Sequence, residues 1–198
     1  MPTKAMDEKR REEIVNLLSE AFGSEYRKYY ELQLKVWEGK EPEAMHVAEV
    51  DGEVAAYLLA ATYYGSADGG KYAYLYCVAT KEELRGQGLM SALCSETLEE
   101  LARKGFSGAF LVPTDESLIP FYEKFGFRKR TTPAYNYPPV DGREYLIPGE
   151  AAQIYLEASG EKEASRGEIL LPLVSGWMYL PFSERPLPED AVPIWPLP

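Results

Sequence analysis

Hydrophobic positions predict two amphipathic helices at the N-terminal end of the chain. Between residues 7 and 22, apolar side chains recur every three or four positions among charged ones, which is the spacing of one buried helical face. Gly23 is expected to end this helix, because glycine readily adopts the left-handed conformation found after a helix C-terminus. Ser24 is expected to cap a second helix that runs to about Trp37.

Apolar runs then predict strands. Residues 44–50 and 53–64 flank Asp51-Gly52, a dipeptide favoured in two-residue hairpin turns. Residues 72–79 alternate two sets of side chains that are both apolar or aromatic, so this strand is expected to be covered on both faces. The elements expected after it are a loop at 80–88, a helix from 89 to about 104, a strand at 108–112, a short helix at 116–124 and a strand or hairpin from 127 to about 137.

The character of the chain changes after residue 138. A helix at 149–158 and strands at 168–174 and 177–182 are plausible there, and the proline-rich end is expected to be extended. This change predicts a core domain at 1–138 and a C-terminal extension at 139–198.

Composition excludes some partners. The chain of 198 residues carries 32 Asp and Glu against 21 Lys and Arg, a formal net charge of −11. An acidic surface argues against general nucleic-acid binding and against anionic lipid, and it permits a cationic partner. The sequence shows neither the apolar segment of a secretory signal nor the ~18 apolar residues of a membrane span. A cytoplasmic protein is therefore expected, with an oligomer left open, and Cys77 and Cys94 are expected to be buried, reduced thiols.

The segment from Val78 to Ser91 carries candidate chemistry. A strand runs into a loop that contains Arg85-Gly86-Gln87-Gly88, and a helix follows at once. Glycines let a ligand approach the backbone, and the first amides of a helix together with its dipole attract anions. Arginine adds a permanent positive charge suited to phosphate. A glycine pair between strand and helix is also a common plain turn, and neither a Walker A loop nor a dinucleotide fingerprint is present.

Two stretches resemble one family. The run LYCVATKEELRGQGLMSALCSETLEEL resembles motif A of the GNAT acetyltransferases, with Arg85, Gly88 and Met90 at its fixed positions. Residues 114–127, TDESLIPFYEKFGF, resemble the family's motif B. The resemblance covers about 10–130, and the form of both motifs is most similar to the enhanced-intracellular-survival-like branch, with a shortened C-terminal region.

The resemblance implies an α+β fold of the GNAT type: a mixed, mostly antiparallel twisted sheet flanked by helices, with a small C-terminal appendage. It also implies acetyl-CoA as the co-substrate, bound by the loop and by the adjoining strand edge. Met90 stands where the signature has Gly or Ala, and Asp115 stands where many members have an asparagine, so Asp115 is more plausibly a helix cap. The positions assigned to the co-substrate are Cys77, Val78, Ala79, Thr80, Arg85, Gly86, Gln87, Gly88, Leu89, Met90, Ser91 and Asp115.

The implied reaction is direct transfer of an acetyl group to an amine, with no metal. Tyr122 matches the family tyrosine that protonates the departing thiolate. Without the motif, its aromatic neighbours would indicate a residue that packs in the core. Glu49 is a weak candidate for the base, and Cys77 is a candidate nucleophile that is more plausibly inert. The alternative function is a non-catalytic acyl-CoA-binding sensor or interaction module on the same fold.

Aromatic side chains point to a class of acceptor. Tyrosines are frequent in the second helix and in the strand at 72–79, and most of them are expected in the core. In the family that the motifs resemble, the first two helices often cover the acceptor. Some rings, together with Glu25, Glu31 and Glu38, are therefore expected to surround a cationic amine.

Overall fold

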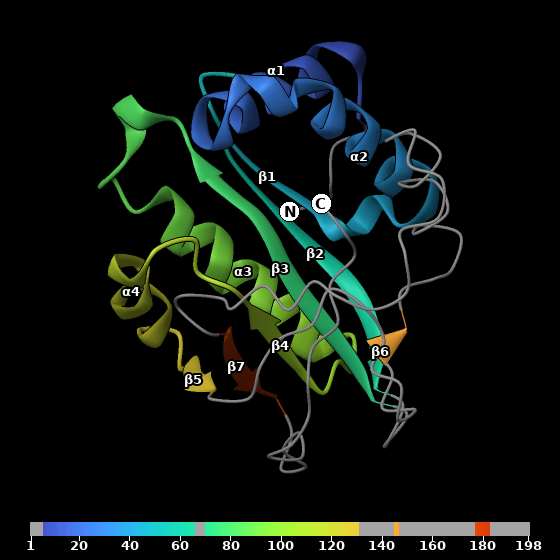
Figure 1. Ribbon diagram of the computed structural model, residues 1–198, viewed down its shortest axis with the longest axis vertical. Helices are drawn as coiled ribbons and strands as arrows, with labels where there is room; N and C mark the ends of the chain where they lie inside the picture. The colour runs from blue at the N-terminus through green and yellow to red at the C-terminus, as the bar shows by residue number, and fades with distance from the viewer. Residues whose placement is uncertain (1–5, 66–69, 131–144, 147–176, 183–198) are drawn as a thin grey trace. The chain divides into compact units, whose positions relative to one another are not determined.

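The computed structural model describes residues 6–65, 70–130, 145–146 and 177–182 (Figure 1). The chain divides into two units. The first contains Met1–Ala61 and Leu75–Glu100, and the second contains Thr62–Tyr74 and Leu101–Pro198. Both predicted N-terminal helices, the hairpin and the glycine loop belong to the first unit.

The first helix is confirmed, and the start of the second differs from the prediction. α1 (Glu8–Phe22) begins after Asp7, whose carboxylate accepts a hydrogen bond from the Arg10 amide at 2.8 Å. Gly23, at φ 117°, ends it. Ser24 does not cap α2 (Arg27–Lys40): it opens a short 3₁₀ turn, η1 (Ser24–Tyr26), and α2 follows directly. The chain thus changes direction through a tight turn between the two helices.

The predicted hairpin is also confirmed. After η2 (Pro42–Ala44), β1 (Met45–Val50) pairs antiparallel with β2 (Glu53–Gly65). Asp51 and Gly52 both have positive φ, 53° and 80°, as a two-residue turn matching the strand twist requires.

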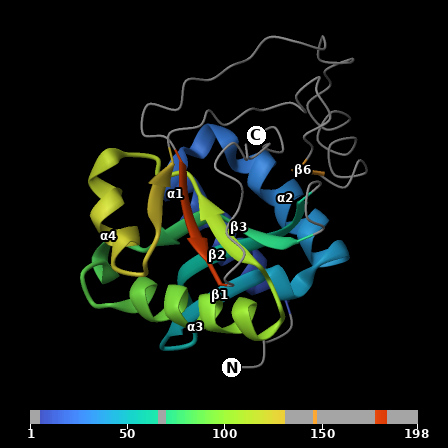
Figure 2. The same ribbon diagram turned by 90° about the horizontal axis from the view of Figure 1, so that it is seen from below.

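β3 (Lys71–Thr80) follows β2 in the sheet and leads through η3 (Glu82–Leu84) to α3 (Leu89–Arg103). Within the first unit, the strands lie between α1 and α2 on one side and α3 on the other (Figure 2). The residues of β3 from 72 to 75 are all buried, which confirms that this strand is covered on both faces. The core of this unit includes Ile14, Leu17, Leu18, Leu34, Met45, Tyr57, Leu58, Leu59, Leu93 and Leu98.

The second unit contains the remaining elements. β4 (Gly108–Leu111) is followed by η4 (Glu116–Leu118), α4 (Ile119–Glu123) and β5 (Arg128–Arg130), and the short β6 (Tyr145–Leu146) pairs with the end of β2. β7 (Trp177–Pro181) confirms the strand predicted at 177–182. It pairs antiparallel with both β4 and β5 and so lies between them.

β7 shows where one segment of the predicted C-terminal extension lies in the fold. Although it follows residue 138, this strand pairs with β4 and β5 of the second unit, and its Trp177 and Met178 are fully buried. The division at residue 138 stays a prediction. The helix predicted at 149–158, the strand at 168–174, the proline-rich end and most of the strand expected to reach residue 137 lie outside the described residues. No helix in the described ranges combines the length and the apolar character needed to cross a membrane.

Candidate functional site

The loop between β3 and α3 exposes a row of backbone amides. The first hydrogen bond of α3 runs from the Ala92 amide to the Gly88 carbonyl at 2.9 Å, so the helix begins directly after Gly88. The preceding turn, η3, uses the amides of Leu84 and Arg85. Across the residues that the structure describes, no carbonyl accepts a hydrogen bond from the six amides between Gly86 and Ser91. These donors are therefore available to an anion.

Glycine is required at two points of this loop. Gly86 and Gly88 have φ values of 77° and 83°, which place both in the left-handed region. A Cβ built at either position would meet no atom within 4 Å, so the backbone there faces open space. Arg85 is exposed, and its Nε donates to the Thr80 carbonyl at 3.3 Å, which holds the guanidinium beside the end of β3. Free amides, an open backbone and one cation suit a pyrophosphate group.

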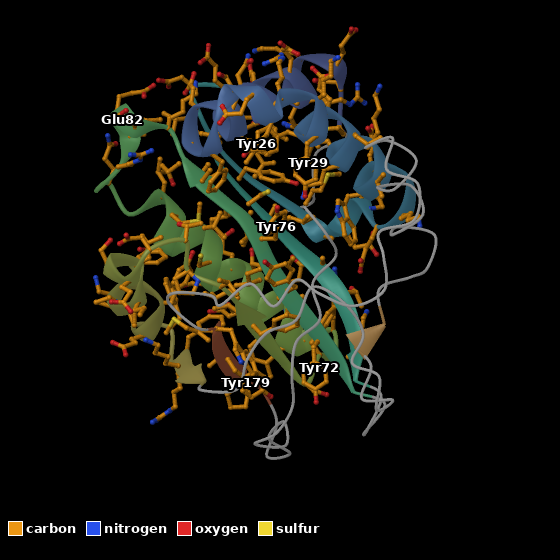
Figure 3. All side chains as sticks on the ribbon, viewed as in Figure 1. Tyr26, Tyr29, Tyr72, Tyr76, Glu82 and Tyr179 are labelled. Carbon is orange, nitrogen blue, oxygen red and sulfur yellow. The ribbon has the colours of Figure 1, made fainter. Side chains whose placement is uncertain are left out.

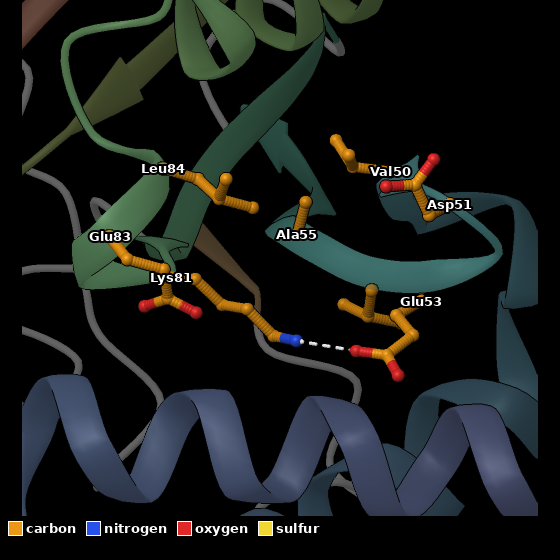
Figure 4. A pocket seen from close by; sticks show the side chains of 8 residues that line it. Val50, Asp51, Glu53, Ala55, Lys81, Glu83 and Leu84 are labelled. Atoms are coloured by element: carbon orange, nitrogen blue, oxygen red, sulfur yellow. Dashed lines mark hydrogen bonds and ion pairs between the residues drawn. The ribbon is translucent and has the colours of Figure 1, made fainter.

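A pocket of about 330 Å³ lies next to the loop, and Figure 4 shows its lining. It contains none of the positions that the family resemblance assigns to acetyl-CoA. Lys81 on its edge forms an ion pair with Glu53 at 3.1 Å, and Asp51 and Glu83 add two further carboxylates. Its excess of negative charge makes this pocket unsuitable for a phosphate. The lining residues are Val50, Asp51, Glu53, Val54, Ala55, Lys81, Glu83 and Leu84.

β3 carries a kink that the sequence pattern did not predict. Cys77 has φ 51°, a left-handed conformation that costs a non-glycine residue about 1–3 kcal/mol. Such a residue keeps this conformation only where its surroundings hold it. The kink lies immediately before Val78, Ala79 and Thr80, the strand edge assigned by resemblance to the co-substrate. No sequence signal marked it, because cysteine carries no preference for positive φ.

Both cysteines are free and buried, as predicted. Burial raises the pKa of the Cys77 thiol to about 12, although its contacts with Gln33 and Tyr76 act in the opposite direction. Burial also raises the pKa of Cys94 to about 12. A thiol that stays protonated at neutral pH is a poor nucleophile. This favours direct transfer over an acyl-enzyme formed on Cys77.

These buried groups predict a loss of stability in alkali. Burial, followed by the charges of Cys77, Glu25 and Tyr26, also raises the pKa of Tyr30 to about 12. Each group keeps its proton in the folded state up to about pH 12 but loses it from about pH 9 (cysteine) or pH 10 (tyrosine) in the unfolded chain. The free energy of unfolding should therefore fall across this interval by about 1.4 kcal/mol per pH unit for each group.

Urea unfolding of the wild type and of Tyr30→Phe at several pH values from 8 to 11.5 tests this expectation. The variant has one ionising group fewer, so its curve should fall less steeply above about pH 10. Parallel curves would show that Tyr30 ionises equally in the folded and unfolded chains.

Glu49, the candidate base, is engaged in an ion pair. It lies at a register shift in β1 between Ala48 and Glu49, and its carboxylate accepts from Nη2 of Arg10 on α1. The Arg10 side chain is 7% exposed and that of Glu49 is 28% exposed, so a partly buried contact joins the helix to the hairpin. The pair gives Glu49 a structural role, and its role as a base stays a prediction.

Asp115 and Tyr122 lie in the second unit. The Asp115 carboxylate accepts from the Ser117 amide at 2.7 Å, which confirms it as the cap of the turn that precedes α4. This hydrogen bond lowers the pKa of Asp115. Tyr122 is 6% exposed, and its ring packs edge-on against Phe121 and Phe127. Its role as an acid stays a prediction.

The decisive comparison is with family models. Residues 11–127, more than half of the chain, match the acetyltransferase (GNAT) family. The chain belongs to the GNAT acetyltransferase family. Its fold is accordingly the GNAT fold, a mixed sheet flanked by helices, as the sequence motifs implied. The narrower likeness to the enhanced-intracellular-survival-like branch is not supported.

Solved structures show the same fold. A GCN5-related N-acetyltransferase from Kribbella flavida is 18% identical over 64% of this chain, with a TM-score of 0.54. The match covers 33% of that protein, so this chain spans about a third of its length. YhbS from Escherichia coli, solved with CoA, is 17% identical over 91% of this chain and 81% of its own, with a TM-score of 0.54. A GNAT acetyltransferase from Brucella melitensis, solved with acetyl-CoA, is 21% identical over 63% and 80%, with a TM-score of 0.50. Comparison with curated proteins gives no match.

Proposed function

We propose that this GNAT family member is an N-acetyltransferase that moves the acetyl group of acetyl-CoA to a primary amine. The observation that carries the proposal is the row of free amides from Gly86 to Ser91 beside the Arg85 guanidinium. In a chain of net charge −11, this is a local arrangement suited to an anion. Two solved proteins of similar fold contain acetyl-CoA or CoA, which agrees with a pyrophosphate as the anion.

The transfer is proposed to be direct. The unprotonated amine forms a bond to the thioester carbonyl carbon, the carbon–sulfur bond breaks, and the sulfur leaves as a thiolate. Tyr122 is proposed to donate its hydroxyl proton to this thiolate, while the excess proton of the amine passes to water or to a base. A phenol with a pKa near 10 can be a proton donor in such a step if it is correctly positioned.

The acceptor is proposed to be cationic. Of the three acids expected near the tyrosines, Glu38 is held by Arg11 at 2.7 Å and Glu31 by Arg27 at 3.3 Å. Glu25 has no ion-pair partner among the described residues, and its charge reaches Tyr30. Its neighbour Tyr26 is 54% exposed, a large ring at the surface. An available carboxylate beside aromatic rings suits an ammonium group.

Two measurements test the function. Acetyl-CoA should raise the melting temperature, because a ligand that binds only the folded state stabilises it. Release of free CoA thiol should then depend on an added amine. Glu25→Gln should raise KM for a diamine more than for a monoamine of the same length, because only the diamine has a second ammonium group. Stabilisation without turnover over a broad amine panel would favour the acyl-CoA sensor, and absence of both would contradict either function.

A further inference from the structure

Two consecutive residues of β3 are each held by a side chain of α2. The Tyr76 hydroxyl lies 3.1 Å from the Tyr29 hydroxyl, and the Cys77 thiol donates to Oε1 of Gln33 at 3.4 Å. Figure 3 shows Tyr29 close to Tyr76. All four residues belong to the first unit.

The kink at Cys77 makes this double contact possible. Tyr29 and Gln33 are one helical turn apart, so their side chains leave the same face of α2. In a regular strand, Tyr76 and Cys77 would point to opposite faces of the sheet. Both nevertheless contact this one helix face, and the residue with positive φ is Cys77 itself. The two contacts and the kink therefore depend on each other.

Burial strengthens the contact between Gln33 and Cys77. Gln33 is 1% exposed, and its bond to Cys77 is fully buried. Water does not compete for these atoms, and breaking the contact would leave the amide oxygen buried without a donor. A polar glutamine is otherwise an unfavourable choice for a buried helix face that an aliphatic side chain could fill.

We propose that Tyr29 and Gln33 are positioning residues that hold the kink at Cys77 and thereby fix the strand edge at Val78, Ala79 and Thr80 for the pantetheine arm of CoA. The inference rests on the proposed function, because it takes this edge to be part of the CoA site. Among the described residues, no hydrogen bond joins Tyr29 or Gln33 to the loop from Gly86 to Ser91. The two parts of CoA should therefore respond differently when the kink is released.

The experiment compares two probes by isothermal titration calorimetry: CoA, and 3′-phospho-ADP, which ends at the pyrophosphate and lacks the pantetheine arm. Gln33→Leu and Tyr29→Phe should each weaken CoA binding about 5- to 20-fold and change 3′-phospho-ADP binding less than twofold. Cys77→Ser, which keeps a hydrogen donor for Gln33, should retain CoA affinity better than Cys77→Ala does.

Thr97→Val is the matched control. Thr97 is also 1% exposed in the first unit, but its hydroxyl has no hydrogen-bond partner among the described residues. This variant should bind both probes as the wild type does. Hydrogen exchange adds a second readout: amides of residues 75–80 should exchange faster in Gln33→Leu and not in Thr97→Val.

The outcomes separate the two proposals. Wild-type affinity for CoA in both Gln33→Leu and Tyr29→Phe would overturn the positioning role, and so would an equal loss of both probes. If Gln33→Leu fails to fold, Tyr29→Phe, which removes one oxygen atom, decides the question. Failure of the wild type to bind CoA at all would instead refute the proposed function and, with it, this inference.

Discussion

Replacing Tyr122 with phenylalanine should lower kcat about 100- to 10,000-fold, the range typical of a lost general acid. The affinity for CoA should change little, because the proposed role concerns only the departing thiolate. The fold should survive, since the ring keeps its edge-on contacts with Phe121 and Phe127 and its carbonyl still accepts from the amides of Phe125 and Phe127. Steady-state thiol release and CoA titration measure the two quantities separately.

Tyr179→Phe is the matched control for this variant. Tyr179 lies on β7 in the same unit, and it is 4% exposed against 6% for Tyr122. Both substitutions remove one hydroxyl from a buried ring of the second unit, so an effect on kcat that comes only from the loss of a buried hydroxyl should appear in both. A large fall in kcat confined to Tyr122→Phe supports the acid, whereas unchanged turnover, or an equal fall in the two variants, contradicts it.

Local sequence signals predicted most elements of the first unit. Asp51-Gly52 required two positive φ angles, and the chain has them. The apolar stripe of α1 and the glycine after it marked that helix closely, because both signals act within a few residues. The prediction that Ser24 caps α2 was wrong because it also used a local signal. A serine can begin a 3₁₀ turn as well as cap an α-helix, and the sequence does not distinguish these two structures.

Contacts between distant residues could not be predicted in this way. Cys77, the residue at the kink, donates to Gln33, which is 44 residues away in the sequence. Glu49 pairs with Arg10 across 39 residues, and that pairing gives the candidate base a structural contact as well. β7 pairs with β4 although about 70 positions separate them. In each case, the partner is chosen by packing of the folded chain, and neither residue carries a local signal for it.

The ion pairs show how the cations of this acidic chain, with its net charge of −11, are distributed. Arg11, Arg27 and Lys81 each neutralise an acid of the first unit. Arg85 is different, because it donates to a backbone carbonyl and keeps its charge for the loop. The excess of acid is therefore compatible with the anion site proposed at the loop after β3, and the sign of the whole chain does not predict the ligand of that loop.

Gly88→Ala should weaken CoA binding about 10- to 100-fold. The added methyl group would occupy open space beside the loop, where we expect it to keep a bound phosphate away from one or more of the loop amides. A hydrogen bond to a charged group contributes about 1.5–3 kcal/mol, which corresponds to this loss of affinity. Affinity should fall for 3′-phospho-ADP as strongly as for CoA, since both carry the pyrophosphate.

A substitution at a second glycine, Gly105, distinguishes the effect of backbone strain at Gly88 from the effect of lost ligand contact. Gly105 has φ 76° against 83° at Gly88, and a Cβ at either position would meet no atom within 4 Å. Alanine should therefore cost both positions a similar amount of stability, about 1 kcal/mol. Only Gly88→Ala should lose CoA affinity. Equal affinity in Gly88→Ala, Gly105→Ala and the wild type, measured by calorimetry alongside urea unfolding, would show that the loop after β3 does not hold the pyrophosphate.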